Sequence, residues 1–131
     1  MTCLETDFLI DIIRQRPEAI QKLKQLESLG EKLSITPITA TELFEGGSIV
    51  HREKEMEKIE STIHSLQWLQ YDVIAAQKAG ELMSKLSNYG QKIGDLDTIT
   101  AGIALRHGQT TLITKNRKHF EKISGLKIEG W

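Results

Sequence analysis

The chain has 131 residues, enough for one compact domain and too few for two separate cores. Hydrophobic residues make up 39% of the chain and charged residues 27%, a balance typical of a globular protein rather than a disordered one. Seventeen Lys and Arg against 18 Asp and Glu leave a formal net charge of −1. Binding to nucleic acid through bulk positive charge is therefore excluded, and any such contact requires a local basic patch.

Cysteine content and hydropathy indicate the compartment. Cys3 is the only cysteine, so no disulfide can form within the chain, and we expect it to pack as a small apolar residue in a strand. The chain does not open with the basic stretch and apolar run of a signal peptide. No segment approaches the roughly 20 apolar residues of a membrane-spanning helix. These features predict a soluble cytoplasmic protein with no membrane partner.

The N-terminal region predicts a strand followed by two helices. Residues 1–5 are short and apolar enough for a buried strand, and apolar residues at helical spacing follow, with Thr6 or Asp7 placed to cap the helix. Pro17 suits the first turn of a second helix that Gly30 ends. The apolar stripe expected on this second helix is Ile20, Leu23, Leu26 and Leu29.

A second strand and two further helices are expected next. Residues 32–36 predict the strand, and Thr39 with Glu42 resembles a capping box that opens a third helix, which the glycines at 46–47 interrupt. A charged helix follows from about residue 50 to residue 66. Its apolar residues form a narrow seam: Met56, Ile59, Ile63 and Leu66. Such a seam suits packing against one other helix, from this chain or from a partner.

The following region predicts a weak strand and two helices. Residues 65–70 form the possible third strand, and residues 72–86 form an alanine-rich helix that residues 88–90 end. The residues expected to face inward from this helix are Val73, Ala76, Ala79, Leu82, Met83 and Leu86. The helix over 97–106 is nearly apolar apart from its ends, so it should lie against a sheet.

The C-terminal region predicts a strand over 110–113, a short helix over 117–123 and a fifth strand over 126–128. Because strands alternate with helices and no hairpin signal occurs, we expect an α/β fold of three layers. Its centre would be a parallel sheet of about five strands flanked by helices. In such sheets ligands bind outside the carboxyl ends of the strands.

Acidic and amide side chains stand at these predicted strand ends. They are Glu5, Asp7, Glu42, Asp95, Asp97 and Asn116. Each lies in an otherwise apolar segment, unlike the members of a solvated charged face. Clustered carboxylates repel one another, and a divalent cation relieves that repulsion. Because Mg²⁺ and Mn²⁺ prefer carboxylate oxygens and water, and no His/Cys set competes, the sequence predicts a site for one of these ions.

Several of these acids also have a purely structural interpretation. Asp7 could be a helix cap, and Asp95 could cap a helix that begins near Asp97. Glu42 could complete the capping box, and Asp97 could itself serve only as a cap. The residue pattern alone leaves these alternatives open.

Four segments in order, and a fifth after them, carry a resemblance to a known family. They are residues 4–10 (LETDFLI), 41–46 (TELFEG), 93–102 (IGDLDTITAG), 112–120 (LITKNRKHF) and 123–131 (ISGLKIEGW). Together they resemble the PIN-domain family, specifically the VapC ribonucleases of toxin–antitoxin pairs. Each motif alone is weak, and their order and spacing make the resemblance specific. It covers the chain from end to end, which implies a single PIN domain over 1–131.

The resemblance implies a metal-dependent endoribonuclease. Glu5, Glu42 and Asp97 would hold Mg²⁺ or Mn²⁺, and Asn116 would take the fourth catalytic position. The side chains expected to support these carboxylates are Thr6, Thr114 and Asp95. The implied reaction is hydrolysis of an RNA phosphodiester bond by metal-activated water. The implied partners are RNA, a small antitoxin protein and a second copy of the chain.

A group of cations follows Asn116 in the sequence. Lys115, Arg117 and Lys118 could hold RNA phosphates beside the metal. His119 and Lys122 belong to the same group. Contacts to phosphates position a nucleic acid without reading its sequence. A solvated helix face explains these residues equally well.

Two other functions are open at this stage. Glu5 stands where the family commonly has Asp, and its extra methylene extends its reach by about 1 Å. A poorly fitted ligand would leave a catalytically weakened PIN-like module that binds RNA or antitoxin. The run from Glu5 to Asp7 also resembles the first motif of haloacid-dehalogenase-like phosphatases, with Thr36 and Lys92 as further parts, although their nucleophile is Asp.

Overall fold

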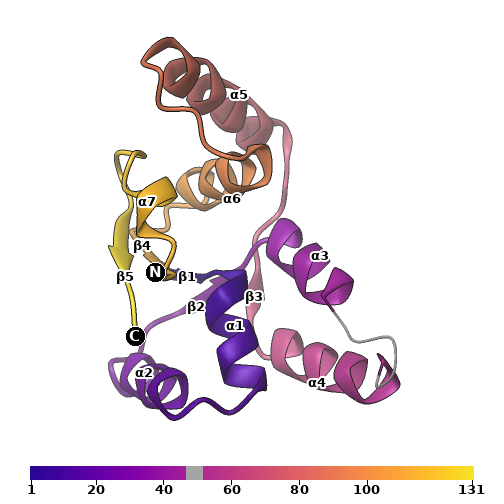
Figure 1. Cartoon of the computed structure of the whole chain (residues 1–131). Coiled ribbons are helices and arrows are strands. Elements are labelled where there is room, and N and C mark those ends of the chain that lie inside the picture. The colour runs from indigo at the N-terminus through magenta and orange to yellow at the C-terminus, as the bar shows by residue number, and fades with distance from the viewer. Residues whose placement is uncertain (47–51) are drawn as a thin grey trace.

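The computed structural model describes residues 1–46 and 52–131, and this part contains one sheet of five strands (Figure 1). The strands are β1 (Thr2–Leu4), β2 (Leu33–Ile35), β3 (Gln67–Trp68), β4 (Thr111–Ile113) and β5 (Lys127–Glu129). Their order is β3-β2-β1-β4-β5, and each neighbouring pair is parallel. The predicted α/β class and parallel sheet are therefore confirmed, with β1 at the centre.

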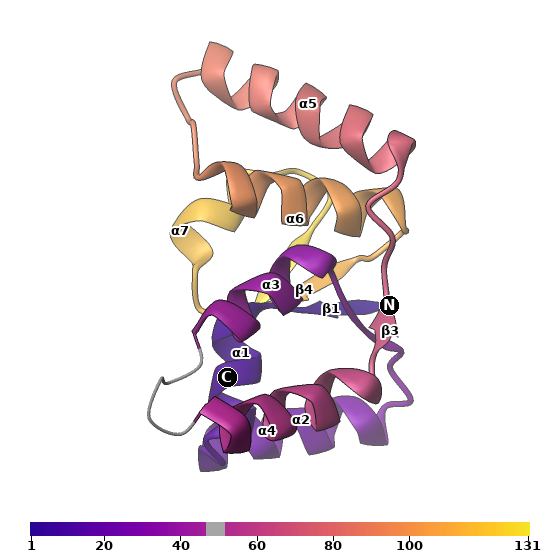
Figure 2. The same cartoon turned by 90° about the vertical axis from the view of Figure 1, so that its right-hand side faces the viewer.

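Helices cover both faces of the sheet. Those of the described part are α1 (Thr6–Ile13), α2 (Pro17–Ser28), α3 (Pro37–Glu45), α4 (Arg52–His64), α5 (Val73–Asn88), α6 (Asp95–Arg106) and α7 (Arg117–Phe120). In Figure 2 the sheet lies between α5 and α6 on one side and α2 and α4 on the other. The three expected layers are therefore present. Within the described ranges, no helix has the length and apolar character needed to cross a membrane.

Two hydrophobic cores form because successive strand residues point to opposite faces. Cys3 and Leu112 face the core shared with α5, α6 and α7, whereas Leu4 and Ile113 face the core shared with α1 to α4. All four side chains are fully buried. Burial raises the pKa of the Cys3 thiol to about 12, so this residue is a neutral core side chain, as expected.

The apolar seam of α4 packs within the chain. Ile59 and Ile63 are buried in the core shared with α1, α2 and α3, and Met56 and Leu66 lie partly buried against the same core. The intrachain alternative is therefore confirmed for the described part of the predicted helix. Residue 50, its expected start, lies outside the described residues, as does the second glycine at 47.

The predicted start of the third helix is wrong. Helix α3 begins at Pro37 rather than at Thr39, and the N-cap residue is Thr36. Its hydroxyl accepts a hydrogen bond from the Thr39 backbone N–H at 3.2 Å, while Pro37 at the first helical position has no N–H to satisfy. Glu42 therefore lies inside the helix and is not part of a capping box.

Three residues that were predicted to face the core are exposed instead. Leu29 follows the end of α2 and is 70% exposed. Val73 is 75% exposed and Ala76 is exposed, because α5 packs on α6 through Ala75, Ala79 and Leu86. A helix that rests on a single neighbouring helix buries a narrower stripe than a helix that rests on a sheet.

Helices α5 and α6 approach each other at one glycine. A Cβ added to Gly102 would lie 2.8 Å from both the Cα and the Cβ of Ala79. Because a backbone atom is involved, no rotation of a side chain relieves the overlap. Gly102 is therefore required for the spacing of this helix pair. Gly80, in exposed α5 one residue beyond Ala79, has nothing within 4 Å of the equivalent position.

These two glycines give a matched test of the helix contact. Gly102→Ala should lower the free energy of unfolding by about 1–3 kcal/mol, the usual cost of overpacking. Gly80→Ala should raise it by about 0.5–1 kcal/mol, because alanine restricts the unfolded chain and fits an exposed helix. Urea denaturation of both variants measures the difference. Equal effects of the same sign would contradict the close contact.

Candidate active site

The candidate site lies at the carboxyl edge of the sheet. Glu5 directly follows central β1, and its backbone N–H donates to the carbonyl of Ile113, the last residue of β4, at 3.1 Å. Glu42 comes from α3, Asp97 from the first turn of α6 and Asn116 from the N-cap of α7. Four separate segments thus bring the predicted site residues to one end of the sheet.

The Glu5 carboxyl is buried at the centre of this group. It is 6% exposed, and the hydroxyl of Thr39 donates to its Oε1 at 2.7 Å. Burial raises the pKa of Glu5 to about 8; the Thr39 hydrogen bond opposes the rise, and the charges of Glu42, Asp97 and Asp7 add to it. These three acids are therefore close enough to act on Glu5 electrostatically.

Glu42 experiences the same field less strongly. Its pKa is also raised, first by burial and then by the charges of Asp97 and other neighbouring acids, while the hydroxyl of Thr6 opposes the rise by donating to Oε1 at 3.0 Å. Thr6 therefore contacts one of the predicted site carboxylates.

Asp97 is held by two side chains of the segment after β4. The Nδ1 atom of His119 lies 2.8 Å from Asp97 Oδ2, and the Asn116 amide donates to the same oxygen at 3.3 Å. Within the described residues, no hydrogen bond reaches Asp97 Oδ1, Glu5 Oε2 or Glu42 Oε2. Each of the three acids therefore has one anchored oxygen and one that remains available to a ligand.

Asp7 differs from these three acids because both of its oxygens are used. Oδ1 accepts from the backbone N–H of Phe8 at 2.9 Å, while Oδ2 accepts from the Thr114 hydroxyl at 3.0 Å and the Lys115 backbone N–H at 2.8 Å. Thr6 and Asp7 lie inside α1, whose N-cap is Glu5, so neither is the N-cap expected from the sequence. Asp7 ties α1 to the end of β4, and Thr114 orients this acid rather than a candidate ligand.

Asp95 does not join the site. Helix α6 begins at Asp95 with Gly94 as its N-cap, so the expected cap at Asp95 and the expected helix start at Asp97 are both wrong. Asp95 is exposed, and in the described part of the chain no hydrogen bond or ion pair links it to the other acids. Asp97 lies in the first helical turn, where the free N–H groups and the helix dipole favour a carboxylate.

The predicted cationic group is divided between two roles. Arg117 forms an ion pair with Glu121 at 2.7 Å and donates to the carbonyl of Ile128 at 3.1 Å, so it connects α7 to β5. The Lys115 ammonium lies 4.5 Å from the centre of the Trp131 ring. Lys118 is exposed on α7. Arg117 and Lys115 are thus engaged in contacts within the chain.

Two side chains in the site had been assigned other roles from the sequence. The sequence predicts a helix cap at Thr39 and a cationic group that includes His119, but these side chains contact Glu5 and Asp97, respectively. A signal for His119 was present, because it follows Asn116 by three residues and so shares its side of a helix. The contact between Thr39 and Glu5 depends on the start of α3 at Pro37. The apparent capping box at Thr39 indicated a later start, so this contact was not predicted.

The donor set fits a hard divalent cation that keeps part of its water shell. In the described ranges no three Asp, Glu, His or Cys side chains converge closely enough to hold an ion directly. Mg²⁺ commonly binds through one or two carboxylates and retains several waters. The unanchored oxygens of Glu5, Glu42 and Asp97 are carboxylate oxygens of that kind. The raised pKa of buried Glu5 shows that its charged form is disfavoured, and a cation would stabilise that form.

The fold and the site together define the class of protein: a three-layer α/β domain with an acidic site at the carboxyl edge of its parallel sheet. Residues 2–126 match the family described as PIN domain. This chain therefore belongs to the PIN domain family. That membership excludes the haloacid-dehalogenase-like alternative; accordingly, Thr36 is buried as a helix cap, and Lys92 is exposed.

Relatives of known name align along nearly the whole chain. The tRNA(fMet)-specific endonuclease VapC of Salmonella typhimurium is 32% identical over 98% of this chain and 96% of its own length. Ribonuclease VapC2 of Haemophilus influenzae is 29% identical with the same coverage of both proteins.

Solved structures agree in fold. VapBC2 of Rickettsia felis, bound to a promoter DNA fragment, has a TM-score of 0.88 at 26% identity, covering 99% of this chain and 98% of that one. DNA-bound VapBC of Salmonella typhimurium has a TM-score of 0.85 at 31% identity, covering 99% and 97%.

The burial of Glu5 predicts a pH-dependent stability. Its pKa is about 8 in the folded state against an ordinary 4.5, so the folded protein keeps a proton that the unfolded chain releases. The contribution is complete below pH 4.5 and is lost as pH rises through 8. In EDTA, the free energy of unfolding should fall across this window by up to about 1.4 kcal/mol per pH unit. Glu5→Gln should flatten the profile.

Urea denaturation at several pH values measures this effect. Glu121→Gln is the matched control, since it removes one carboxylate from an exposed ion pair and should keep the wild-type slope. Parallel profiles for the wild-type protein and Glu5→Gln would show that Glu5 carries its charge freely in the folded state.

Proposed function

We propose that this chain is a Mg²⁺- or Mn²⁺-dependent endoribonuclease, the toxin of a toxin–antitoxin module, acting in the cytoplasm. The observation that carries the proposal is the arrangement of Glu5, Glu42 and Asp97, each with one oxygen anchored by a side chain and one available. The named relatives, an endonuclease and a ribonuclease, support RNA hydrolysis as the reaction.

The residues of this chain would divide the work as follows. Glu5, Glu42 and Asp97 would hold the cation in part through its water shell. When bound, the cation lowers the pKa of a water and stabilises charge on a phosphate. Asn116 holds Asp97 through its amide. Lys115 and Lys118, near the same edge, would hold RNA phosphates and thereby place the scissile bond.

Asp97→Asn tests the metal site. The variant keeps the shape of the side chain and removes one charge, so Mn²⁺ affinity should fall by at least about tenfold, with RNA cleavage falling in parallel. Isothermal titration with Mn²⁺ measures the affinity. Cleavage is measured on tRNA(fMet), chosen because a relative is named as specific for it. Glu121→Gln, away from the acids, is the control that should retain both activities.

The outcomes separate the proposal from its alternative. Cleavage by the wild-type protein that requires Mn²⁺ or Mg²⁺ and stops in EDTA supports the ribonuclease. Binding of tRNA without cleavage under any metal would identify a weakened PIN-like binding module. Unchanged Mn²⁺ affinity of Asp97→Asn would remove this residue from the site.

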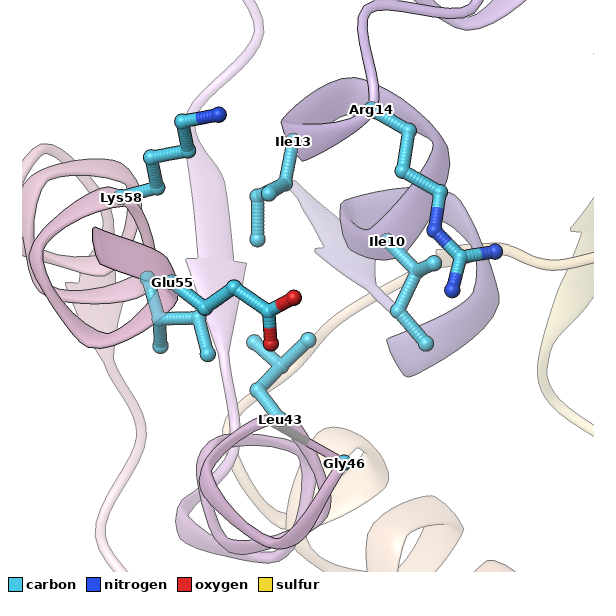
Figure 3. Close-up of a pocket in the computed structure, with 8 residues that line it drawn as sticks. Ile10, Ile13, Arg14, Leu43, Gly46, Glu55 and Lys58 are labelled. Carbon is cyan, nitrogen blue, oxygen red and sulfur yellow. The ribbon is translucent and has the colours of Figure 1, made fainter. Parts of the chain in front are cut away.

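An antitoxin partner is part of the proposal, because the solved relatives are VapBC toxin–antitoxin complexes. A pocket of about 260 Å³ between α1, α3 and α4 is a suitable docking site (Figure 3). Ile10, Ile13 and Leu43 contribute apolar surface to it, and exposed Arg14 and Lys58 lie beside them. Glu55 also lines this pocket, with its carboxylate beside Leu43. The apolar surface fits an antitoxin segment that inserts an apolar side chain.

Ile13→Gln tests this docking site. It replaces an apolar pocket wall by a polar side chain and should weaken capture of the protein encoded by the adjacent gene by at least about tenfold. Ile20→Gln is the control, because Ile20 is equally half-buried but lies on α2, outside the pocket. Pull-down titration compares the variants. Equal capture by both variants would place the antitoxin elsewhere.

We also propose a homodimer, but not through the α4 seam, which is covered within the chain. Among the described residues, four exposed apolar side chains lie close together in sequence: Trp68, Tyr71, Val73 and Ile74. They surround the start of α5 beside edge strand β3, and this surface could meet a second copy. Sedimentation velocity at micromolar concentration distinguishes a dimer from a monomer.

A further inference from the structure

His119 contacts the carboxylate of Asp97 from α7. Its Nδ1 atom lies 2.8 Å from Asp97 Oδ2, and the Asn116 amide nitrogen lies 3.3 Å from the same oxygen. A carboxylate oxygen accepts hydrogen bonds, so Nδ1 carries the hydrogen and donates it. The Asn116 amide, 3.2 Å from Nδ1, therefore stands beside a donor and gives its own hydrogen to Asp97.

The segment that carries His119 is fixed to the sheet. The next residue, Phe120, is fully buried in the core, and the Asn116 backbone N–H donates to the Thr114 hydroxyl at 3.1 Å. Arg117 adds its bond to the Ile128 carbonyl. The imidazole therefore approaches Asp97 from a rigid support, which is the condition for orienting another side chain accurately.

We propose that His119 is a positioning residue that holds Asp97 Oδ2 through its Nδ1–H and so leaves Oδ1 directed to a cation. The inference rests on the metal site proposed above. It assigns to His119 the part that Thr39 plays for Glu5 and Thr6 plays for Glu42. In the described part of the chain, Asp97 receives two side-chain donors, from His119 and Asn116, whereas Glu5 and Glu42 receive one each.

Three substitutions of one residue test this role. His119→Asn places an amide N–H near the position of Nδ1, whereas His119→Gln places it near that of Nε2, and His119→Ala removes both. Loss of a hydrogen-bond partner of a metal ligand typically costs about 10–100-fold in metal affinity. Isothermal titration should therefore show Mn²⁺ affinity reduced by about that factor in the Ala and Gln variants and nearly restored in the Asn variant.

A kinetic measurement separates positioning from direct catalysis. If His119 acts through Asp97, saturating Mn²⁺ should return kcat of His119→Ala on tRNA(fMet) to near the wild-type value. His64→Ala, an exposed change at the end of α4, is the control for both measurements. Urea denaturation confirms that the variants compared are folded.

The possible failures are distinct. If the wild-type protein binds no Mn²⁺, the proposed metal site is wrong and the role of His119 falls with it. If the wild-type protein binds Mn²⁺ and all three variants bind it equally well, only the inference about His119 is overturned. It is also overturned if His119→Asn is as weak as His119→Ala, because the Nδ1 hydrogen bond would then not be the cause.

Discussion

Burial of the Glu5 carboxyl at the end of the central strand is the constraint on which the site depends. A carboxyl that is 6% exposed and surrounded by other acids carries its charge only at a cost, as its pKa of about 8 shows. The hydrogen bond from the Thr39 hydroxyl compensates only part of that cost. A cation bound at this edge of the sheet, where four segments meet, would therefore stabilise the charged form of Glu5.

The same edge separates acids that support the fold from acids that could bind a ligand. Both oxygens of Asp7 accept hydrogen bonds, from Phe8, Thr114 and Lys115, and so join α1 to the end of β4. In each candidate ligand only one oxygen accepts a hydrogen bond from the described residues. Counting the bonds of each oxygen thus distinguishes the two groups more clearly than sequence position does, since Glu5 and Asp7 are only two residues apart.

The sequence predicted the sheet, its parallel strands and the meeting of Glu5, Glu42 and Asp97 at one edge because these depend on local patterns and on topology. Alternation of apolar runs with helical spacing indicates strands and helices, and the carboxyl edge follows from topology. The start of α3 was not predictable from the capping box, because Thr36 and Pro37 provided a competing and stronger start. The exposed face of α5 depends on its single neighbour, α6, which no pattern within α5 reveals.

Thr39 also bears on the unusual length of Glu5. The extra methylene would be a defect if the site were built for Asp, but the Thr39 hydroxyl meets Glu5 Oε1 at 2.7 Å, a short hydrogen bond. An aspartate at this position would draw its oxygens back by about 1 Å and lengthen that contact. Strand β1 and helix α3 are each held by their own core packing, so neither can readily follow the shorter side chain. The pairing of Glu5 with Thr39 therefore favours a site fitted to glutamate over one weakened by it.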